Sequence, residues 1–255
     1  FENKKIQVSS TEAVSSSLHN NSRGTYVHSI PLRKRDMYSF YFDSLLDIYC
    51  PVINDIGFIT NNQYCQIKPS PSGQLIAISS ADHQIDIFQS QDEYLHIIHK
   101  THIPHNVPFS IEFSQNEKYI YVSSEGKKIH QYNISTFPID SILHSKKTII
   151  INDNYVYGTL QITGNGHIYV AQADSVFLGE IIDANYSHSS YLSKGIFLGK
   201  NRKSRYGLPN FNASYFHTPS IDFAYTEDCW EHSYAFEGRD TFDADGYKWI
   251  FEKVN

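Results

Sequence analysis

Methionine, tryptophan and alanine are scarce in this sequence of 255 residues, which contains 1 Met, 2 Trp and only ten Ala. Aromatic residues instead make up 15% of the chain, with 19 Tyr and 16 Phe. β-Branched and aromatic residues favour strands, whereas alanine and methionine favour helices. The composition therefore excludes a mainly helical protein and predicts an all-β fold.

Cysteine is also scarce, and the three positions are Cys50, Cys65 and Cys229. They permit at most one internal disulfide, and their spacing contains no CxxC or Cys/His zinc pattern. Two alternatives stay open for Cys50 and Cys65, a bridge between neighbouring strands or two buried free thiols, and the free thiols are favoured.

Long apolar runs are missing, because no stretch reaches the 18 or so apolar residues that a membrane-spanning helix needs. No positively charged segment followed by an apolar one indicates a signal peptide, so we expect a soluble chain. The first residue is Phe1 rather than Met, which indicates a processed or truncated product. The net charge of -6 argues against nucleic acid as a partner, since phosphate binding needs a concentrated positive surface.

An internal repeat is the most informative feature that is present. The block at residues 67–79 (IKPSPSGQLIAIS) returns at 111–123 (IEFSQNEKYIYVS), 44 residues later, and a shorter copy stands at 160–171 (LQITGNGHIYVA). The strand that follows repeats as well, at 84–88 and 128–132. Each unit reads as strand, tight turn, apolar strand, polar loop and another strand, with Gly73 and Gly166 suited to the turns.

A period in the forties with several strands per unit is typical of β-propeller blades, whose faces must stack on neighbouring blades. The strands at 75–78 and 119–122 are continuously apolar, as expected where both faces of a sheet are covered. Residues 25–30 and 37–43 predict two strands of an earlier blade joined by the basic turn 33–36, and residues 1–24 one edge strand. The sequence thus predicts about four units, at the lower end of the usual number of blades.

From about Gln63 to Phe216 the chain resembles the β-propeller region of gliding-motility-associated, type IX-secreted bacterial surface proteins. The turns at 69–79, 108–123 and 160–171 match that family's "SPDGKKLA", "PYGVEFSPDGKKLYVS" and "LQLGPDGKIYVA" segments in order and spacing. Residues 201–216 (NRKSRYGLPNFNASYF) match its "GRKSxxGLPxFxxSYF" segment. Here Leu208, Phe211, Tyr215 and Phe216 are expected as apolar anchors that lock the last strand onto the ring.

The remainder of the chain, residues 218–255, resembles the start of a PKD-like β-sandwich, with strands at 221–225, 229–236 and 247–251. The predicted organisation is therefore a propeller at 1–217, with a possibly incomplete ring, followed by a partial PKD/Ig-like domain. An incomplete sheet needs a partner, either packed against it or supplied by further chain.

The resemblance implies a secreted or cell-surface binding or adhesion module of bacteria, located extracellularly or on the outer membrane surface. Its expected partner is a protein or glycan ligand, together with a partner or missing segment that completes the propeller. Two alternatives stay open: a propeller-type enzyme that hydrolyses or cleaves glycans, and a structural spacer in a surface assembly.

Four histidines, His96, His99, His102 and His105, recur at every third residue and raise a metal hypothesis. Residues three apart on a strand point to opposite faces, so one extended segment cannot aim all four at a single ion. Pro104 and Pro108 indicate an inter-blade loop, in which a metal contact from two histidines stays open as an alternative. Polar loop histidines are the favoured interpretation.

Carboxylates raise two further hypotheses. Asp240, Asp243 and Asp245 before Gly246 faintly match a calcium loop, but no Glu closes it, and an Asp-Gly hairpin turn is favoured. A propeller enzyme would need a carboxylate pair at the channel mouth, for which the candidates are Glu112, Glu125, Asp82 and Asp86.

No nucleophile elbow, zinc motif or phosphate loop occurs in the sequence. We therefore predict no catalytic, cofactor-binding or metal-binding residue, and no cofactor. Nine tyrosines could stack on sugars or peptides, although blade-to-blade packing is the favoured role for most of them: Tyr26, Tyr38, Tyr41, Tyr119, Tyr121, Tyr132, Tyr155, Tyr157 and Tyr169.

Overall fold

The chain divides into two compact units, Phe1–His217 and Thr218–Asn255. The computed structural model describes residues 13–18, 24–43, 50–59, 65–80, 84–90, 95–124, 128–135, 138–151, 156–216, 221–228 and 233–240. In the second unit, β17 (Ile221–Asp228) and β18 (Ser233–Asp240) form an antiparallel pair. The predicted strand at 247–251 lies outside the described residues. Two paired strands do not establish a sandwich, so the PKD-like domain stays a prediction.

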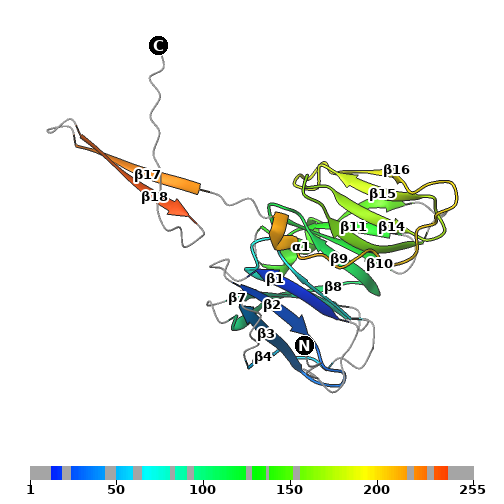
Figure 1. Ribbon diagram of the computed structural model, residues 1–255, viewed down its shortest axis with the longest axis horizontal. Helices are drawn as coiled ribbons and strands as arrows, with labels where there is room; N and C mark the ends of the chain where they lie inside the picture. The colour runs from blue at the N-terminus through cyan, green and yellow to red at the C-terminus, as the bar shows by residue number, and fades with distance from the viewer. Residues whose placement is uncertain are drawn as a thin grey trace, which may run out of the picture. The chain divides into compact units, whose positions relative to one another are not determined.

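The first unit contains four four-stranded antiparallel sheets, each a simple meander of consecutive strands (Figure 1). Blade 1 consists of β1 (Val14–Leu18), β2 (Gly24–Ser29), β3 (Asp36–Asp43) and β4 (Val52–Asp55). Blade 2 consists of β5 (Cys65–Pro69), β6 (Leu75–Ser80), β7 (Gln84–Ser90) and β8 (Ile97–Pro104).

Blade 3 consists of β9 (Pro108–Phe113), β10 (Tyr119–Ser124), β11 (Lys128–Asn133) and β12 (Lys147–Ile151), with the helix α1 (Ile139–His144) between the last two strands. Blade 4 consists of β13 (Tyr157–Ile162), β14 (Ile168–Gln172), β15 (Phe177–Ile182) and β16 (Ser190–Phe197). A short 3-10 helix, η1 (Ala213–Phe216), follows.

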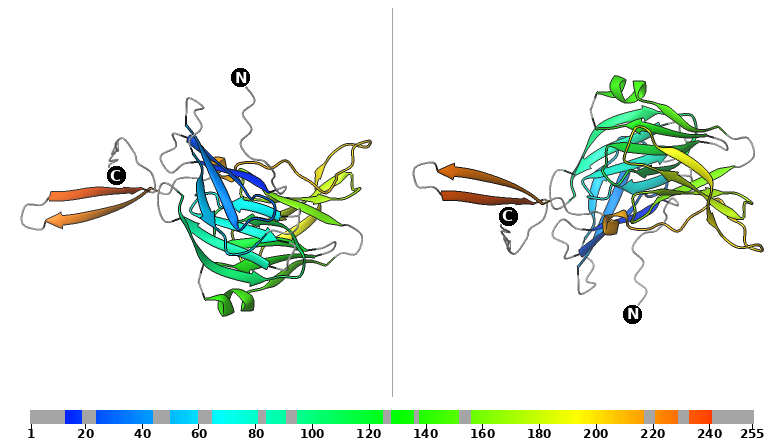
Figure 2. Two further views of the ribbon diagram at one scale, coloured as in Figure 1. Left: turned by 90° about the horizontal axis from the view of Figure 1, so that it is seen from below. Right: turned by 90° about the horizontal axis from the view of Figure 1, so that it is seen from above.

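The first strands of successive blades contact one another in the order β1, β5, β9, β13, so these strands are the inner ones. Figure 2 shows the four blades fanned around them in chain order, from blue through cyan and green to yellow. This is the β-propeller predicted from the repeat. The expected strand within residues 1–24 is β1, the innermost strand of the first blade.

Three hydrophobic clusters fill the spaces between neighbouring blades. In β6, Ile76 and Ile78 pack toward blade 1, whereas Ala77 packs toward blade 3. In β10, Ile120 packs toward blade 2 and Tyr121 toward blade 4. Since side chains of a strand alternate between faces, a continuously apolar strand is what a sheet covered on both faces requires.

The turns between the first two strands of blades 2, 3 and 4 share a left-handed residue. Gly73, Glu117 and Gly166 have φ values of 75°, 58° and 78°. The two glycines adopt this conformation at no steric cost, whereas Glu117 does so against its intrinsic preference. Its carboxylate accepts hydrogen bonds from the backbone N–H and the hydroxyl of Ser72, so it connects the turns of adjacent blades.

Cys50 and Cys65 are both free thiols. The prediction of unbridged cysteines is therefore right for this pair, but Cys50 is exposed rather than buried. Cys229 lies outside the described residues. No helix in the described part of the chain is long and apolar enough to cross a membrane.

Candidate functional site

A buried polar network connects the inner strands of blades 2, 3 and 4. Lys68 of β5, Glu112 of β9 and Gln161 of β13 occupy equivalent positions of the repeat. The Lys68 Nζ lies 2.7 Å from Glu112 Oε2 and donates to Gln161 Oε1 at 3.1 Å. The side chains of Lys68 and Glu112 are only 1% and 0% exposed. The ion pair is therefore buried at the contact between the inner strands of blades 2 and 3.

Glu112 also accepts hydrogen bonds from two backbone N–H groups, those of Ile162 at 2.9 Å and Phe113 at 3.0 Å. Burial raises the pKa of Glu112, and the ammonium of Lys68 and these donors oppose that rise. Three donors, one of them an ammonium, therefore engage a carboxylate whose side chain is 0% exposed. This arrangement holds three blades together and leaves the carboxylate without access to a substrate.

The predicted carboxylate pair of a glycan-cleaving enzyme is not formed by the described candidates. Glu112 is paired with Lys68, and Asp86 of β7 accepts from Gln84 and lies 2.9 Å from His99 Nε2. Glu125 and Asp82 lie outside the described residues. A retaining or inverting glycosidase needs two accessible carboxylates about 5–10 Å apart, and Glu112 and Asp86 do not supply them.

The histidine series divides between two environments. His99 and His102 lie on β8 rather than in a loop, which corrects the prediction, because β8 continues to Pro104. His105 is buried, with hydrogen-bond contacts to Tyr132 at 2.8 Å and Ser124 at 2.9 Å. Within the described residues no group of three His, Cys, Asp or Glu side chains is arranged to hold a metal ion.

Burial lowers the pKa of His105 to about 3 and that of the neighbouring His130 to about 4. Their rings pack edge to face with centroids 5.1 Å apart. Both are neutral packing histidines at physiological pH. For the calcium hypothesis, Asp240 ends β18, and Asp243, Asp245 and Gly246 lie outside the described residues.

Residues 199–216, here named the closing segment, connect the last blade to the first. Near β13, the Tyr206 carbonyl accepts from Thr159 N–H at 2.8 Å, and Phe211 N–H donates to Gln161 Oε1 at 3.3 Å. Near β1, Leu18 N–H donates to Ser214 Oγ at 3.2 Å. The segment is therefore held at both ends by hydrogen bonds to inner strands.

The aromatic side chains of the closing segment face solvent. Tyr206, Phe211 and Tyr215 are 54%, 45% and 66% exposed, so Phe211 and Tyr215 are not the apolar anchors that the sequence predicted. Phe216, another of the predicted anchors, does pack on the cluster between blades 3 and 4, together with Ala213. Backbone and side-chain hydrogen bonds hold the rest of the segment. The Phe211 ring stacks on Phe216 with centroids 5.0 Å apart.

The same segment concentrates positive charge. It has four exposed cations and no carboxylate, in a chain whose net charge is -6: Lys200, Arg202, Lys203 and Arg205. The neighbouring Asp174 lies 3.8 Å from Arg205, but both side chains are largely exposed and the pair is weak. The result is a basic and aromatic surface on a backbone fixed by hydrogen bonds.

The tyrosines named in the sequence analysis have the packing role that was favoured. Four of them are buried between blades: Tyr26, Tyr121, Tyr132 and Tyr157. The other tyrosines of this set that the structure describes are half-buried. Tyr155 lies outside the described residues. Three of the exposed aromatic residues, Tyr206, Phe211 and Tyr215, lie instead in the closing segment.

Comparisons with known proteins support the fold. No protein-family model matches the chain, and no curated protein matches it significantly. A protein of unknown function from Desulfotomaculum acetoxidans matches with a TM-score of 0.50 and 14% identity over 74% of this chain. A candidate 6-phosphogluconolactonase from Bacteroides uniformis matches with a TM-score of 0.51 and 10% identity over 87% of this chain.

This chain spans 56% of the length of the Desulfotomaculum protein and 69% of the Bacteroides one. At such low identity the matches show the fold of this chain and do not show an activity. The resemblance to gliding-motility-associated proteins and to PKD-like domains stays a prediction from sequence. What the structure and the comparisons establish together is an all-β, propeller-like chain.

Proposed function

We propose that this propeller is a non-enzymatic binding or adhesion module at the outer surface of a bacterial cell, associated with gliding motility or type IX secretion. Its proposed ligand is an acidic polysaccharide, bound by the closing segment. The observation that supports this most is the combination of exposed Tyr206, Phe211 and Tyr215 with four cations on one anchored segment. The motif resemblance of residues 201–216 supports the location and the biological setting.

The chemistry of this surface suits an acidic glycan. Aromatic rings offer flat apolar faces for the C–H faces of sugar rings, and cations attract carboxylates along the polymer. The hydrogen bonds from the segment to β13 and β1 reduce the entropy lost on binding, because the backbone is already ordered. Arg and Tyr are also the residue types that most often dominate binding energy at interfaces.

Immobilised polygalacturonate, with neutral dextran as comparison, tests this proposal. We expect binding to polygalacturonate that weakens with rising salt, since exposed charges are screened. Replacement of Tyr206, Phe211 and Tyr215 by Ser should weaken it by about 10-fold or more. Tyr186→Ser is the matched control, because Tyr186 is 56% exposed but lies outside the segment. Equal binding of dextran, or an unaffected triple variant, would refute the proposal.

A propeller enzyme acting on glycans or sugar lactones is the competing candidate, favoured by the structural match to a candidate 6-phosphogluconolactonase. The burial of Glu112 against Lys68 argues against it. The expected result is no release of reducing ends from polygalacturonate and no hydrolysis of 6-phosphogluconolactone. Turnover of either compound by the purified chain would favour the enzyme over the binding module.

A further inference from the structure

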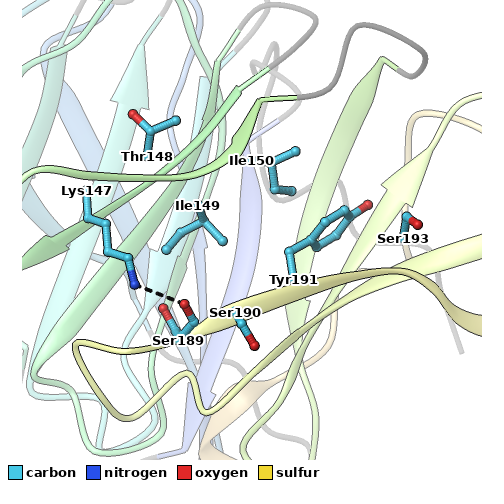
Figure 3. Close-up of a pocket in the computed structure, with 8 residues that line it drawn as sticks. All are labelled: Lys147, Thr148, Ile149, Ile150, Ser189, Ser190, Tyr191 and Ser193. Carbon is cyan, nitrogen blue, oxygen red and sulfur yellow. Dashed lines mark hydrogen bonds between the residues drawn. The ribbon is translucent and has the colours of Figure 1, made fainter.

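A separate cleft lies between the outermost strands of blades 3 and 4. It has a volume of about 380 Å³, within the range of small-molecule sites. Figure 3 shows side chains from β12 on one side and from the start of β16 on the other. The lining residues are Lys147, Thr148, Ile149, Ile150, Ser189, Ser190, Tyr191 and Ser193. This cleft has no residue in common with the closing segment.

Blade 3 holds the β15–β16 loop, residues 183–189, in place beside the cleft. Tyr121 of β10 donates its hydroxyl to the Ala184 carbonyl at 2.9 Å. Gln131 of β11 donates to the Tyr186 carbonyl at 2.8 Å and also to the Tyr121 hydroxyl at 2.7 Å. A wall fixed by buried hydrogen bonds is preorganised, so a ligand would not have to order it.

Lys147 is the only charged side chain among the lining residues. Its Nζ donates to the carbonyls of Ser187 at 2.9 Å and Ser189 at 3.0 Å, and Figure 3 shows it extending from β12 toward β16. An ammonium group has three N–H donors, so these two acceptors position it and leave a donor for a ligand. The carbonyls that precede β16 therefore hold the Lys147 ammonium at the cleft, on the side opposite β12.

The rest of the lining combines hydroxyls with an apolar portion. Ser190 and Ser193 supply hydroxyl groups that can donate and accept, whereas the Thr148 hydroxyl contacts His130 Nδ1 at 3.2 Å and the hydroxyl oxygens of Ser189 and Tyr191 are buried. Ile149, Ile150 and the Tyr191 ring supply apolar surface. None of the described residues that line the cleft is a carboxylate. A ligand that satisfies this set has several hydroxyls, one negative charge and an apolar ring face.

We propose that the cleft between β12 and β16 is a binding site for a small sugar acid, with the carboxylate of the ligand on Lys147 and its hydroxyls on the side chains of Ser190 and Ser193. The site is independent of the polysaccharide surface proposed for the closing segment. Its ligand is a monomeric acid rather than a polymer, because the volume of the cleft is only about 380 Å³.

Isothermal titration of the full chain with sodium glucuronate, glucose and sodium acetate tests the assignment. Glucuronate should bind, and glucose and acetate should each bind about 10-fold or more weakly, since each lacks half of the recognised groups. Lys147→Met should weaken glucuronate binding to a similar extent, because a hydrogen bond to a charged group is lost. Lys118→Met is the matched control, as Lys118 is exposed and does not line the cleft.

A second pair of variants separates loss of the site from loss of the fold. Ser190→Trp places a large side chain at an exposed lining position and should abolish glucuronate binding, with polygalacturonate binding unchanged. Leu192→Trp, at an exposed neighbour outside the lining, should leave both unchanged. No binding of millimolar glucuronate, equal binding of glucose, or unaffected Lys147→Met and Ser190→Trp variants would each overturn the proposal.

Discussion

The buried ion pair between Lys68 and Glu112 makes a strong prediction about stability. Glu112→Gln removes the negative charge while preserving the shape of the side chain. It leaves the Lys68 ammonium, whose side chain is 1% exposed, beside neutral amide oxygens, including that of Gln161 at 3.1 Å, with no carboxylate to balance its charge. Removing one member of a buried ion pair costs about 3–5 kcal/mol, because the remaining charge stays uncompensated.

That loss is a large fraction of the total stability of a domain, which is about 5–15 kcal/mol. Replacing both members at once has a different expected outcome. In the double variant Lys68→Met/Glu112→Leu no charge is left behind, and the loss should fall to within about 2 kcal/mol of the wild type. The backbone N–H groups of Ile162 and Phe113 lose their acceptor in this variant, which accounts for the residual cost.

Urea denaturation followed by tyrosine and tryptophan fluorescence measures these free energies, with Arg35→Gln as a control. Arg35 forms a surface ion pair with Asp55 at 3.2 Å and should contribute less than about 1 kcal/mol. A loss below about 1 kcal/mol for Glu112→Gln would refute the reasoning, as would a double variant less stable than the single one.

Three further predictions concern the turns, a buried histidine and the closing segment. Glu117→Gly should be more stable in thermal denaturation than Glu117→Ala by about 1 kcal/mol, because both lose the bonds to Ser72 but only glycine relieves the positive φ; equal stability would contradict this. Burial lowers the pKa of His28 from 6.5 to about 4, so the unfolded chain binds a proton that the folded chain excludes between these values. His28 alone should therefore lower the unfolding free energy by about 3 kcal/mol as the pH drops from 6.5 to 4, in addition to the contributions of His105 and His130. His28→Gln should remove only its own part of a pH titration of stability. Gly158→Ala would place a Cβ 1.9 Å from the Tyr206 carbonyl oxygen, and it should cost about 1–3 kcal/mol and raise hydrogen exchange in the closing segment; unchanged exchange would argue against the contact.

Much of the fold could be predicted because the repeat is visible in the sequence. Continuously apolar strands such as β6 and β10 predict sheets covered on both faces, and the structure divides their side chains between two clusters. The sequence also contains a pattern from which the buried ion pair could have been predicted, since Lys68 and Glu112 stand 44 residues apart at equivalent repeat positions. Opposite charges at equivalent inner-strand positions of adjacent blades can meet, although from sequence Glu112 was only a candidate acid.

The sites were less predictable for physical reasons. Exposure of Phe211 and Tyr215 depends on backbone hydrogen bonds of the closing segment to strands about 50 and 200 residues away, which residue type does not encode. The cleft beside Lys147 forms only where β12 and β16 approach each other, and its lining residues are ordinary serines and isoleucines in sequence. Glu117 was missed as a left-handed residue because its carboxylate, rather than a glycine, stabilises the turn.

Hydrogen exchange of the chain with and without polygalacturonate tests most directly whether the closing segment is the recognition surface. The account predicts added protection at backbone amides within residues 199–216, and the same protection in the Tyr186→Ser control. Protection confined to other blades, or none at a saturating concentration of the polysaccharide, would contradict it.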